Sequence, residues 1–221
     1  MFVGHFGIGL AAKRFAPRTS LGWLIAAPLL LDLLWPIFLL LGWESVRIDT
    51  DATVVTPFDF ESYPISHSLV AAAGWAVLAG SVYWLIRGYV SGVVVIAAGV
   101  LSHWVLDLVV HRPDLPLFPG GPKFGLGLWN SVPATLAAEA LFFGVGIWIY
   151  ARSTAATSRG GRFGWWAFVV FLVFAYASNF LGPPPTSVEE VAFVTLALWL
   201  MPIWAWSFDR RRTVRARPNQ A

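Results

Sequence analysis

Long apolar segments separated by short polar loops run through the whole chain. Six stretches approach the ~20 consecutive apolar residues that a helix needs to cross a membrane. They are Leu21–Gly42, Ser66–Ile86, Val90–Val110, Ala134–Ala151, Phe163–Leu181 and Val191–Phe208. The leading segment Phe2–Ala12 is also apolar but too short to cross, which predicts a half-helix buried against the bundle or an interfacial segment. The pattern therefore predicts an all-α, polytopic membrane bundle of about six transmembrane helices plus a short N-terminal half-helix.

Composition agrees with this fold class. Hydrophobic residues make up 57% of the 221 positions and charged residues only 12%, whereas soluble domains are about a quarter charged. The chain has no cysteine, which excludes disulfides and thiolate metal sites. Basic residues follow the first apolar segment at Lys13, Arg14 and Arg18 instead of preceding it, so we do not expect a cleaved signal peptide.

The basic residues segregate to alternate loops. Twelve of the fifteen fall on one side of the predicted membrane: Lys13, Arg14, Arg18, Arg87, Arg152, Arg159, Arg162, Arg210, Arg211, Arg212, Arg215 and Arg217. Because Lys and Arg favour cytoplasmic loops, both termini are predicted to be cytoplasmic. Segregation by side argues against a nucleic-acid partner, and the basic tail Arg210–Arg217 is typical of an anionic-lipid anchor. The sequence gives no prediction of oligomeric state.

Histidine placement divides the chain. All four histidines lie before residue 112, and the last two predicted helices contain none. The sequence therefore predicts a working membrane domain at residues 1–151, followed by a two-helix appendage with a basic tail at residues 152–221.

Several ionisable residues fall inside the apolar stretches, where each Asp costs ~2.5–3.5 kcal/mol and usually marks function. They are His5, Asp32, His67, His103, Asp107, His111 and Glu139. Asp32 and His103 each lie twelve residues into their spans, counted from Ser20 and Ser91 on the same side. At ~1.5 Å per residue both reach about 18 Å into the membrane, so we expect them at one level.

His103 and Asp107 are spaced i,i+4 and project from one helix face, close enough to share a metal ion. His111 lies ~12 Å further along an unbroken helix, too far to ligate the same ion. Either His111 serves a second ion or the substrate, or the helix ends and the chain turns back. Arg112-Pro113 favours an ending.

His with Asp and no Cys is typical of a water-activating site that holds a divalent metal such as zinc. Asp32 or Asp107, where it is not a ligand, could act as general base. Structural roles remain open beside this hypothesis. A His–Asp pair can be an interhelical hydrogen bond, as can Glu139. His67, between two serines, could simply neighbour a helix cap, and His5 could lie at the interface.

These short motifs resemble a known family. They are Gly-His5, Asp32 in the first span, Ser66-His67-Ser68 opening the next, and Leu101-Ser102-His103-x-x-x-Asp107 before a Pro-rich turn. Over about residues 1–150 the chain resembles the LexA-regulated, inner-membrane-associated metal-dependent hydrolases of bacteria, which are similar to zinc-dependent phospholipase C. Two positions depart from that pattern: Leu34 replaces the second Asp of an Asp-x-Asp pair, and Tyr63-Pro64-Ile65-Ser66 leads into the histidine motif.

The resemblance implies a hydrolase of the bacterial cytoplasmic membrane that acts on a lipid or lipid-linked ester or phosphoester. By motif, its metal ligands would be His5, Asp32, His67, His103 and Asp107. The rare outer basic residues Arg112 and Lys123 are candidate phosphate contacts. The rival hypotheses are an ion- or proton-coupled transporter that uses the buried Asp/His groups, and a non-catalytic membrane scaffold.

Overall fold

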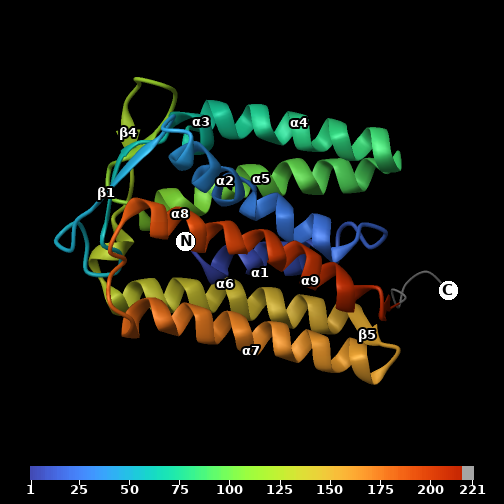
Figure 1. Ribbon diagram of the computed structural model, residues 1–221. Coiled ribbons are helices and arrows are strands. Elements are labelled where there is room, and N and C mark those ends of the chain that lie inside the picture. Colours follow the sequence, from blue (N-terminus) through green and yellow to red (C-terminus); the bar gives the residue numbers. More distant parts are fainter. Residues whose placement is uncertain (216–221) are drawn as a thin grey trace.

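The computed structural model describes residues 1–215 as a membrane helix bundle (Figure 1). A short helix α1 (Val3–Ala12) precedes the long ones. The spans are α2 (Leu21–Leu40), α4 (Leu69–Arg87), α5 (Val90–Val110), α6 (Val132–Ser153), α7 (Arg159–Leu181) and the combined segment α8–η2–α9 (Val188–Leu196, Ala197–Trp199, Leu200–Asp209). Six spans and one half-helix confirm the predicted all-α polytopic fold.

Three small antiparallel strand pairs and two short helical turns complete the described chain. The antiparallel pairs are β1–β2 (Ser45–Ile48, Phe58–Ser62), β3–β4 (Leu115–Pro116, Lys123–Phe124) and β5–β6 (Thr154–Ala156, Arg212–Val214). The turns are α3 (Pro64–His67) and η1 (Leu128–Asn130). The first two strand pairs gather at one end of the bundle and the third lies at the other (Figure 1).

The second predicted span differs from the structure at its start. His67 ends the single turn α3, and Ser68 adopts extended backbone before α4 begins at Leu69. Ser68 caps α4 by accepting a hydrogen bond from the amide of Ala71, so the break has a local cause. His67 therefore lies in a separate turn, and the direction of its side chain does not depend on the axis of α4. The other spans match the prediction to within four residues at each end.

Helix α1 lies inside the bundle, where it packs against α6 and α2. A Cβ on Gly7 would lie 2.3 Å from the carbonyl oxygen of Phe142, and one on Gly146 would lie 2.2 Å from that of Gly7. Small residues that let backbones meet are typical of membrane helix packing. Glycine at these two positions is therefore what admits α1 to the centre.

The first residue is consequently buried. The Met1 amine lies beside Asp107 with no exposure, within the membrane region of the bundle. Lys13, at the far end of α1, pairs with Asp209 at the end of the bundle that carries most of the basic residues. The cytoplasmic placement of both termini stays a prediction. Arg217 of the predicted basic tail lies outside the described residues.

Apolar side chains cover the outward faces of the long helices, while one core connects the first and last helices. Val77 and Leu85 of α4 and Phe163 and Phe174 of α7 are more than half exposed, as lipid-facing side chains must be in a bilayer. The main core cluster contains residues of α1, α2, α6, α7 and α9. Helix α2 also belongs to a second cluster with α4 and α5. Packing in both clusters fixes the position of α2, and with it the position of Asp32.

Candidate metal centre

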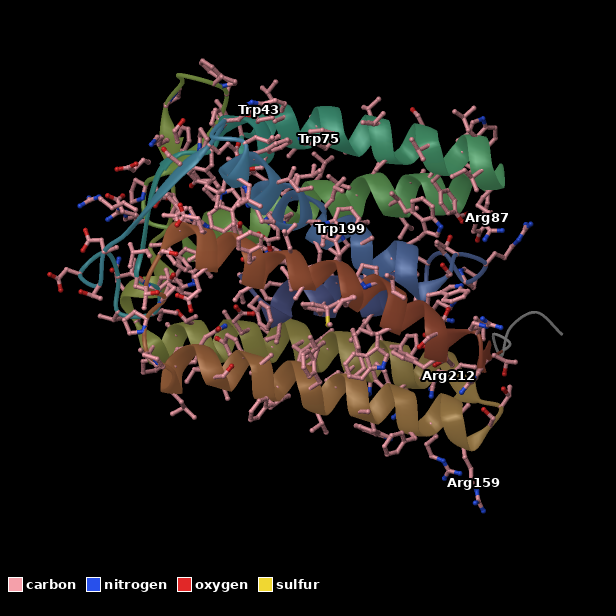
Figure 2. All side chains as sticks on the ribbon, viewed as in Figure 1. Trp43, Trp75, Arg87, Arg159, Trp199 and Arg212 are labelled. Atoms are coloured by element: carbon pink, nitrogen blue, oxygen red, sulfur yellow. The ribbon has the colours of Figure 1, made fainter. Side chains whose placement is uncertain are left out.

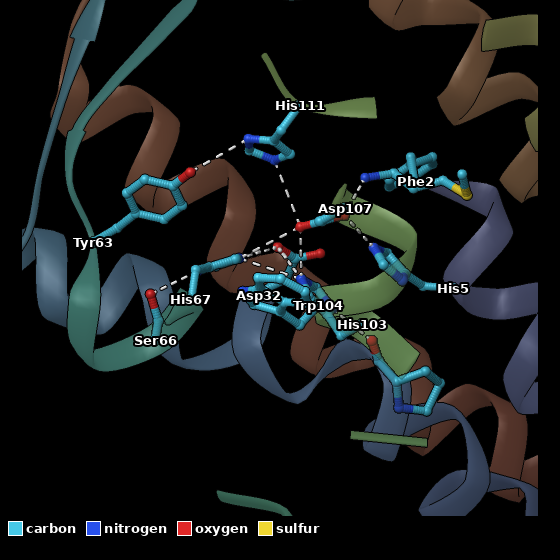
Figure 3. Close-up of polar contacts among 12 residues, drawn as sticks. Phe2, His5, Asp32, Tyr63, Ser66, His67, His103, Trp104, Asp107 and His111 are labelled. Atoms are coloured by element: carbon cyan, nitrogen blue, oxygen red, sulfur yellow. Dashed lines mark hydrogen bonds and ion pairs between the residues drawn. The ribbon is translucent and has the colours of Figure 1, made fainter. Parts of the chain in front are cut away.

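Four histidines and two aspartates converge in one cluster (Figure 3). His5 comes from α1, Asp32 from α2, His67 from α3, and His103 and Asp107 from α5, with His111 immediately after α5. The histidine side chains are at most 5% exposed. The structure therefore brings together all five predicted metal ligands and His111.

Three of the histidines have their Nδ1 atoms held by acceptors. His103 Nδ1 donates to the Pro28 carbonyl at 2.7 Å, and His111 Nδ1 donates to Asp114 Oδ1 at 2.9 Å. A carbonyl or carboxylate oxygen can only accept, so Nδ1 carries the proton in both rings. In the neutral His103 ring the Nε2 lone pair is then free to bind a metal ion.

His67 also carries its proton on Nδ1, because two consecutive hydrogen bonds link it through Ser66 to Glu44. Ser66 Oγ donates its only hydrogen to Glu44 Oε2 at 2.6 Å, and therefore accepts from His67 Nδ1 at 2.6 Å. Glu44 is buried, and its Oε1 also accepts the amides of Ile65 and Ser66. Burial lowers the pKa of His67, which favours the neutral ring with a free Nε2.

Three donor atoms, Asp32 Oδ1, His67 Nε2 and His103 Nε2, are spaced as zinc ligands would be, and Asp107 Oδ2 lies beside the two histidines to make a tetrad. His103 Nε2 lies 3.3 Å from His67 Nε2, 3.7 Å from Asp32 Oδ1 and 3.1 Å from Asp107 Oδ2. His67 Nε2 lies 3.5 Å from Asp32 Oδ1 and 3.9 Å from Asp107 Oδ2. Zinc bonds of ~2.0–2.2 Å place tetrahedral ligands roughly 3.3–3.6 Å apart. Asp32, His67 and His103 therefore fit three ligand positions of one tetrahedral divalent ion, and Asp107 lies next to them.

Asp107 connects this tetrad to α1. Its Oδ2 faces His103 and His67, while its Oδ1 accepts from the Met1 amine at 2.5 Å and contacts His5 Nε2 at 3.1 Å. The His5 ring stacks on His103 with centroids 4.0 Å apart. His5, His103 and Asp107 form a second group with metal-ligand spacing. Both groups use His103 Nε2, and one nitrogen lone pair binds one ion, so the two groups describe one centre.

His111 reaches the cluster because α5 ends, the second of the two sequence alternatives. Its extended backbone (ψ 147°) follows the last helical residue, Val110, and places Nε2 3.6 Å from Asp107 Oδ2. Burial alone would lower the pKa of His111, but hydrogen bonds to Asp107 and Asp114 outweigh burial and raise it. The following loop satisfies free carbonyls at this helix end: Leu126 donates to Leu108 and Gly127 to His111.

The phenol of Tyr63 lies beside His111 and Asp114. Tyr63 is 1% exposed and donates its O–H to Asp114 Oδ1 at 3.0 Å. Burial and the Asp114 carboxylate raise the pKa of Tyr63 well above its usual range, so the phenol keeps its proton. The Tyr63–Asp114–His111 contacts fix the His111 ring in one orientation.

The other predicted site residues lie around the cluster in different roles. Glu139 accepts the amides of Phe2 and Gly4 at 2.6 and 2.7 Å, and so caps the start of α1. Arg112 is paired with Asp59 and with Asp114. Lys123 is exposed on β4 and donates to the carbonyl of Glu61, with no contact to the cluster. The structure therefore places Arg112 near the rim and Lys123 away from it.

Sequence reasoning missed Glu44, Ser66 and Asp114, whose side chains set the histidine tautomers. Glu44 looked like one of many loop acids, because nothing in its spacing shows a fold back onto Ser66. Asp114 had a usable signal: three residues after His111 and next to Pro113, it sits where a tight turn returns to the histidine.

Comparison of the chain with protein-family models, with curated proteins and with solved structures found no match.

Proposed function

We propose that the chain is a membrane-embedded, metal-dependent hydrolase that acts on an ester or phosphoester of a lipid or lipid-linked molecule. The supporting observation is the tetrad of Asp32, His67, His103 and Asp107. The donor atoms of Asp32, His67 and His103 lie at tetrahedral ligand spacing, and Asp107 Oδ2 lies beside both histidine Nε2 atoms. The family resemblance of residues 1–150 points in the same direction.

These four residues would hold the ion, and zinc suits their nitrogen and oxygen atoms. Two carboxylates offset its double positive charge. A bound divalent ion would polarise the scissile group and lower the pKa of water. Glu44, through Ser66, and the Pro28 carbonyl would keep the two histidines in the tautomer that binds a cation.

Asp32 is placed to handle the proton. Its side chain is 24% exposed, whereas His67, His103 and Asp107 are at most 5% exposed, so water and substrate reach the centre on the Asp32 side. Hydrolysis adds water across the ester bond. The attacking water oxygen loses a proton to the carboxylate oxygen of Asp32 that would not hold the ion, and Asp32 passes this proton to the departing alcohol oxygen. Asp107 is less free to do this because α1 occupies its other oxygen.

The depth of the centre indicates the substrate class. His103 lies seven residues and Asp32 eight residues from the ends of their helices, or about 10–12 Å below that end of the bundle. A head group has to meet the cluster at this level while its acyl or isoprenoid chain stays in the bilayer. A lipid or lipid-linked ester satisfies both requirements, and a freely soluble substrate gains nothing from such a site.

Metal analysis combined with a lipid assay tests this function. Purified protein should hold about one zinc or similar ion per chain and release product from a panel of phospholipids and isoprenoid phosphates. Asp32→Asn keeps the side-chain volume and should lower the rate roughly 10²-fold or more. Asp51→Asn, in the exposed β1–β2 loop, is the matched control and should leave the rate unchanged.

The rivals give different outcomes in the same experiment. Turnover that survives a chelator would defeat the metal mechanism. A transporter would show no turnover, but ion flux in proteoliposomes that Asp32→Asn abolishes. A scaffold would show neither activity and no stoichiometric metal.

We also propose that this protein lies in the bacterial cytoplasmic membrane with its metal centre near the outer face. The support is the gathering of Arg87, Arg159 and Arg212 at the opposite end of the bundle (Figure 2), since basic loops stay in the cytoplasm. Because the chain has no cysteine, single cysteines report cleanly. One at Asp51 or Gly120 should react with an impermeant thiol reagent applied from outside, and one at Ser158 should not. The opposite labelling pattern would reverse the orientation.

A further inference from the structure

A pocket of about 520 Å³ lies at the end of the bundle opposite the metal centre. The loop between α6 and α7, the first turns of α7, and β6 form its walls. Four arginines line it: Arg159, Arg162, Arg212 and Arg215. Trp165 and Trp166 complete it on the α7 side.

The positive charge of this pocket is not balanced by carboxylates. No acidic side chain lines it, and within residues 1–215 no ion pair joins any of its four arginines to Asp or Glu. Arg47 and Arg112, in the loops at the other end, do pair with carboxylates. Four uncompensated guanidinium groups around one cavity favour an anionic occupant.

Arg212 forms a rigid part of the pocket. Its guanidinium donates to Thr154 Oγ1 at 2.9 and 3.1 Å and lies over the rings of Tyr150 and Trp165. Burial lowers the pKa of Arg212, although a guanidinium remains charged at any neutral pH. The group is thus held in place before any ligand arrives, which reduces the ordering cost of binding.

The surroundings indicate that the anion belongs to a lipid. Trp166 is 52% exposed and Phe163, one residue after Arg162, is 77% exposed, both on the lipid-facing side of α7. Trp at a membrane surface sits at head-group level. An acyl chain could lie along this apolar face while its phosphate meets the arginines. A free phosphate would use only the polar half of the pocket.

We propose that this pocket binds the phosphate of an anionic phospholipid, on the membrane face opposite the metal centre. Such a site is independent of the hydrolase function, because no residue of the tetrad contributes to it. Its occupant would fix the depth and tilt of α6, α7 and α9 in the bilayer.

Native mass spectrometry of the full chain released from mixed micelles tests the proposal. The probes are phosphatidylglycerol and phosphatidylcholine with identical acyl chains. The protein should retain phosphatidylglycerol roughly tenfold or more in preference to phosphatidylcholine, and Arg159→Gln/Arg162→Gln should remove most of that preference. Both arginines are exposed, so the variant should keep wild-type helicity and metal content. If the double variant does not fold, Arg215→Gln carries the same expectation.

Arg87→Gln is the matched control. Arg87 is exposed at the same end of the bundle but belongs to α4, outside the pocket (Figure 2). It should keep the full preference. If Arg87→Gln and the pocket variant lose the phosphatidylglycerol preference equally, diffuse surface charge causes it and the proposal is overturned. An unchanged preference in the pocket variant would also overturn it. A third arm adds millimolar inorganic phosphate: complete displacement of phosphatidylglycerol would identify a site for free anions and not for a lipid.

Discussion

The two ends of the bundle bury charged groups in opposite ways. At the basic end, Lys13 pairs with Asp209 at 2.7 Å and also donates to the Thr19 carbonyl. Asp209 in turn accepts the amide of Leu21 and the hydroxyl of Tyr150. In this network each donor meets an acceptor. The network joins four helices, α1, α2, α6 and α9.

At the other end, acceptors face acceptors. The Nε2 atoms of His67 and His103 point toward each other and toward carboxylate oxygens of Asp32 and Asp107. Their Nδ1 protons are already committed to Ser66 and the Pro28 carbonyl. Neutral rings in this arrangement leave lone pairs directed at negative charge, which only added protons or a cation can relieve. The first region pairs its buried charges within the protein, whereas in the second region a bound proton or cation would stabilise the His67 and His103 Nε2 atoms beside the carboxylates.

The largest expected effect comes from removing a tetrad histidine. His103→Ala should abolish stoichiometric metal binding and lower hydrolysis roughly 10²-fold or more, since three groups cannot replace the missing nitrogen. Elemental analysis and the lipid assay measure both. Adding zinc should raise the unfolding temperature of the wild type and not of this variant. Full metal content in both His103→Ala and Asp107→Ala would remove this pair from the centre.

Lys13→Met tests the other region. It leaves Asp209 buried without its cation and should lower the free energy of unfolding by about 3–5 kcal/mol. Thermal unfolding in detergent measures the loss. Adding Asp209→Asn should recover part of it, because the amide carries no charge, its oxygen can accept from the Leu21 amide and its NH₂ group can donate to the Tyr150 hydroxyl. Metal content should stay at the wild-type value in both variants, and loss of the ion would show that the two regions are coupled.

The sequence predicts much of the histidine and aspartate cluster, and there is a physical reason why it does not predict the rest. Helical rise alone places Asp32 and His103 at one level, and their contact at 3.7 Å agrees with it. Arg112-Pro113 likewise indicates the helix end that turns His111 back. Loop folds are not periodic, so the route from Glu44 to Ser66 cannot be read from spacing. Asp209 in the predicted appendage was also missed, because its partner lies 196 positions away.

Glu44→Gln should have an intermediate effect. The amide can present its NH₂ group to Ser66 Oγ, which turns the hydroxyl toward His67 Nδ1 and shifts the ring proton to Nε2. Metal affinity should fall roughly 10–100-fold, as for other residues that orient a metal ligand. Metal titration into chelated protein measures the change. Glu61→Gln, an exposed acid in β2, is the matched control, and an equal loss there would mean that loop charge, not the Ser66 contact, sets the affinity.

The smallest effect concerns the approach of α1 to α6. Gly7→Ala would place a Cβ 2.3 Å from the Phe142 carbonyl oxygen, so α1 has to move, at a cost of about 1–3 kcal/mol in unfolding free energy. Gly74→Ala is the control, because its Cβ would meet nothing within 4 Å; higher helix propensity should make it neutral or stabilising by up to ~1 kcal/mol.

Gly7→Ala also tests whether the metal centre depends on the position of α1. Helix α1 carries Lys13 at one end and His5 at the other, so a displaced helix disturbs both contacts. If His5 and the α1 backbone hold Asp107 in place, metal affinity should fall along with stability, by less than in Glu44→Gln because no tautomer changes. Thermal unfolding and metal titration on the same sample distinguish the outcomes. Reduced stability with unchanged affinity would make α1 only a packing element, and would leave the tetrad to position Asp107 by itself.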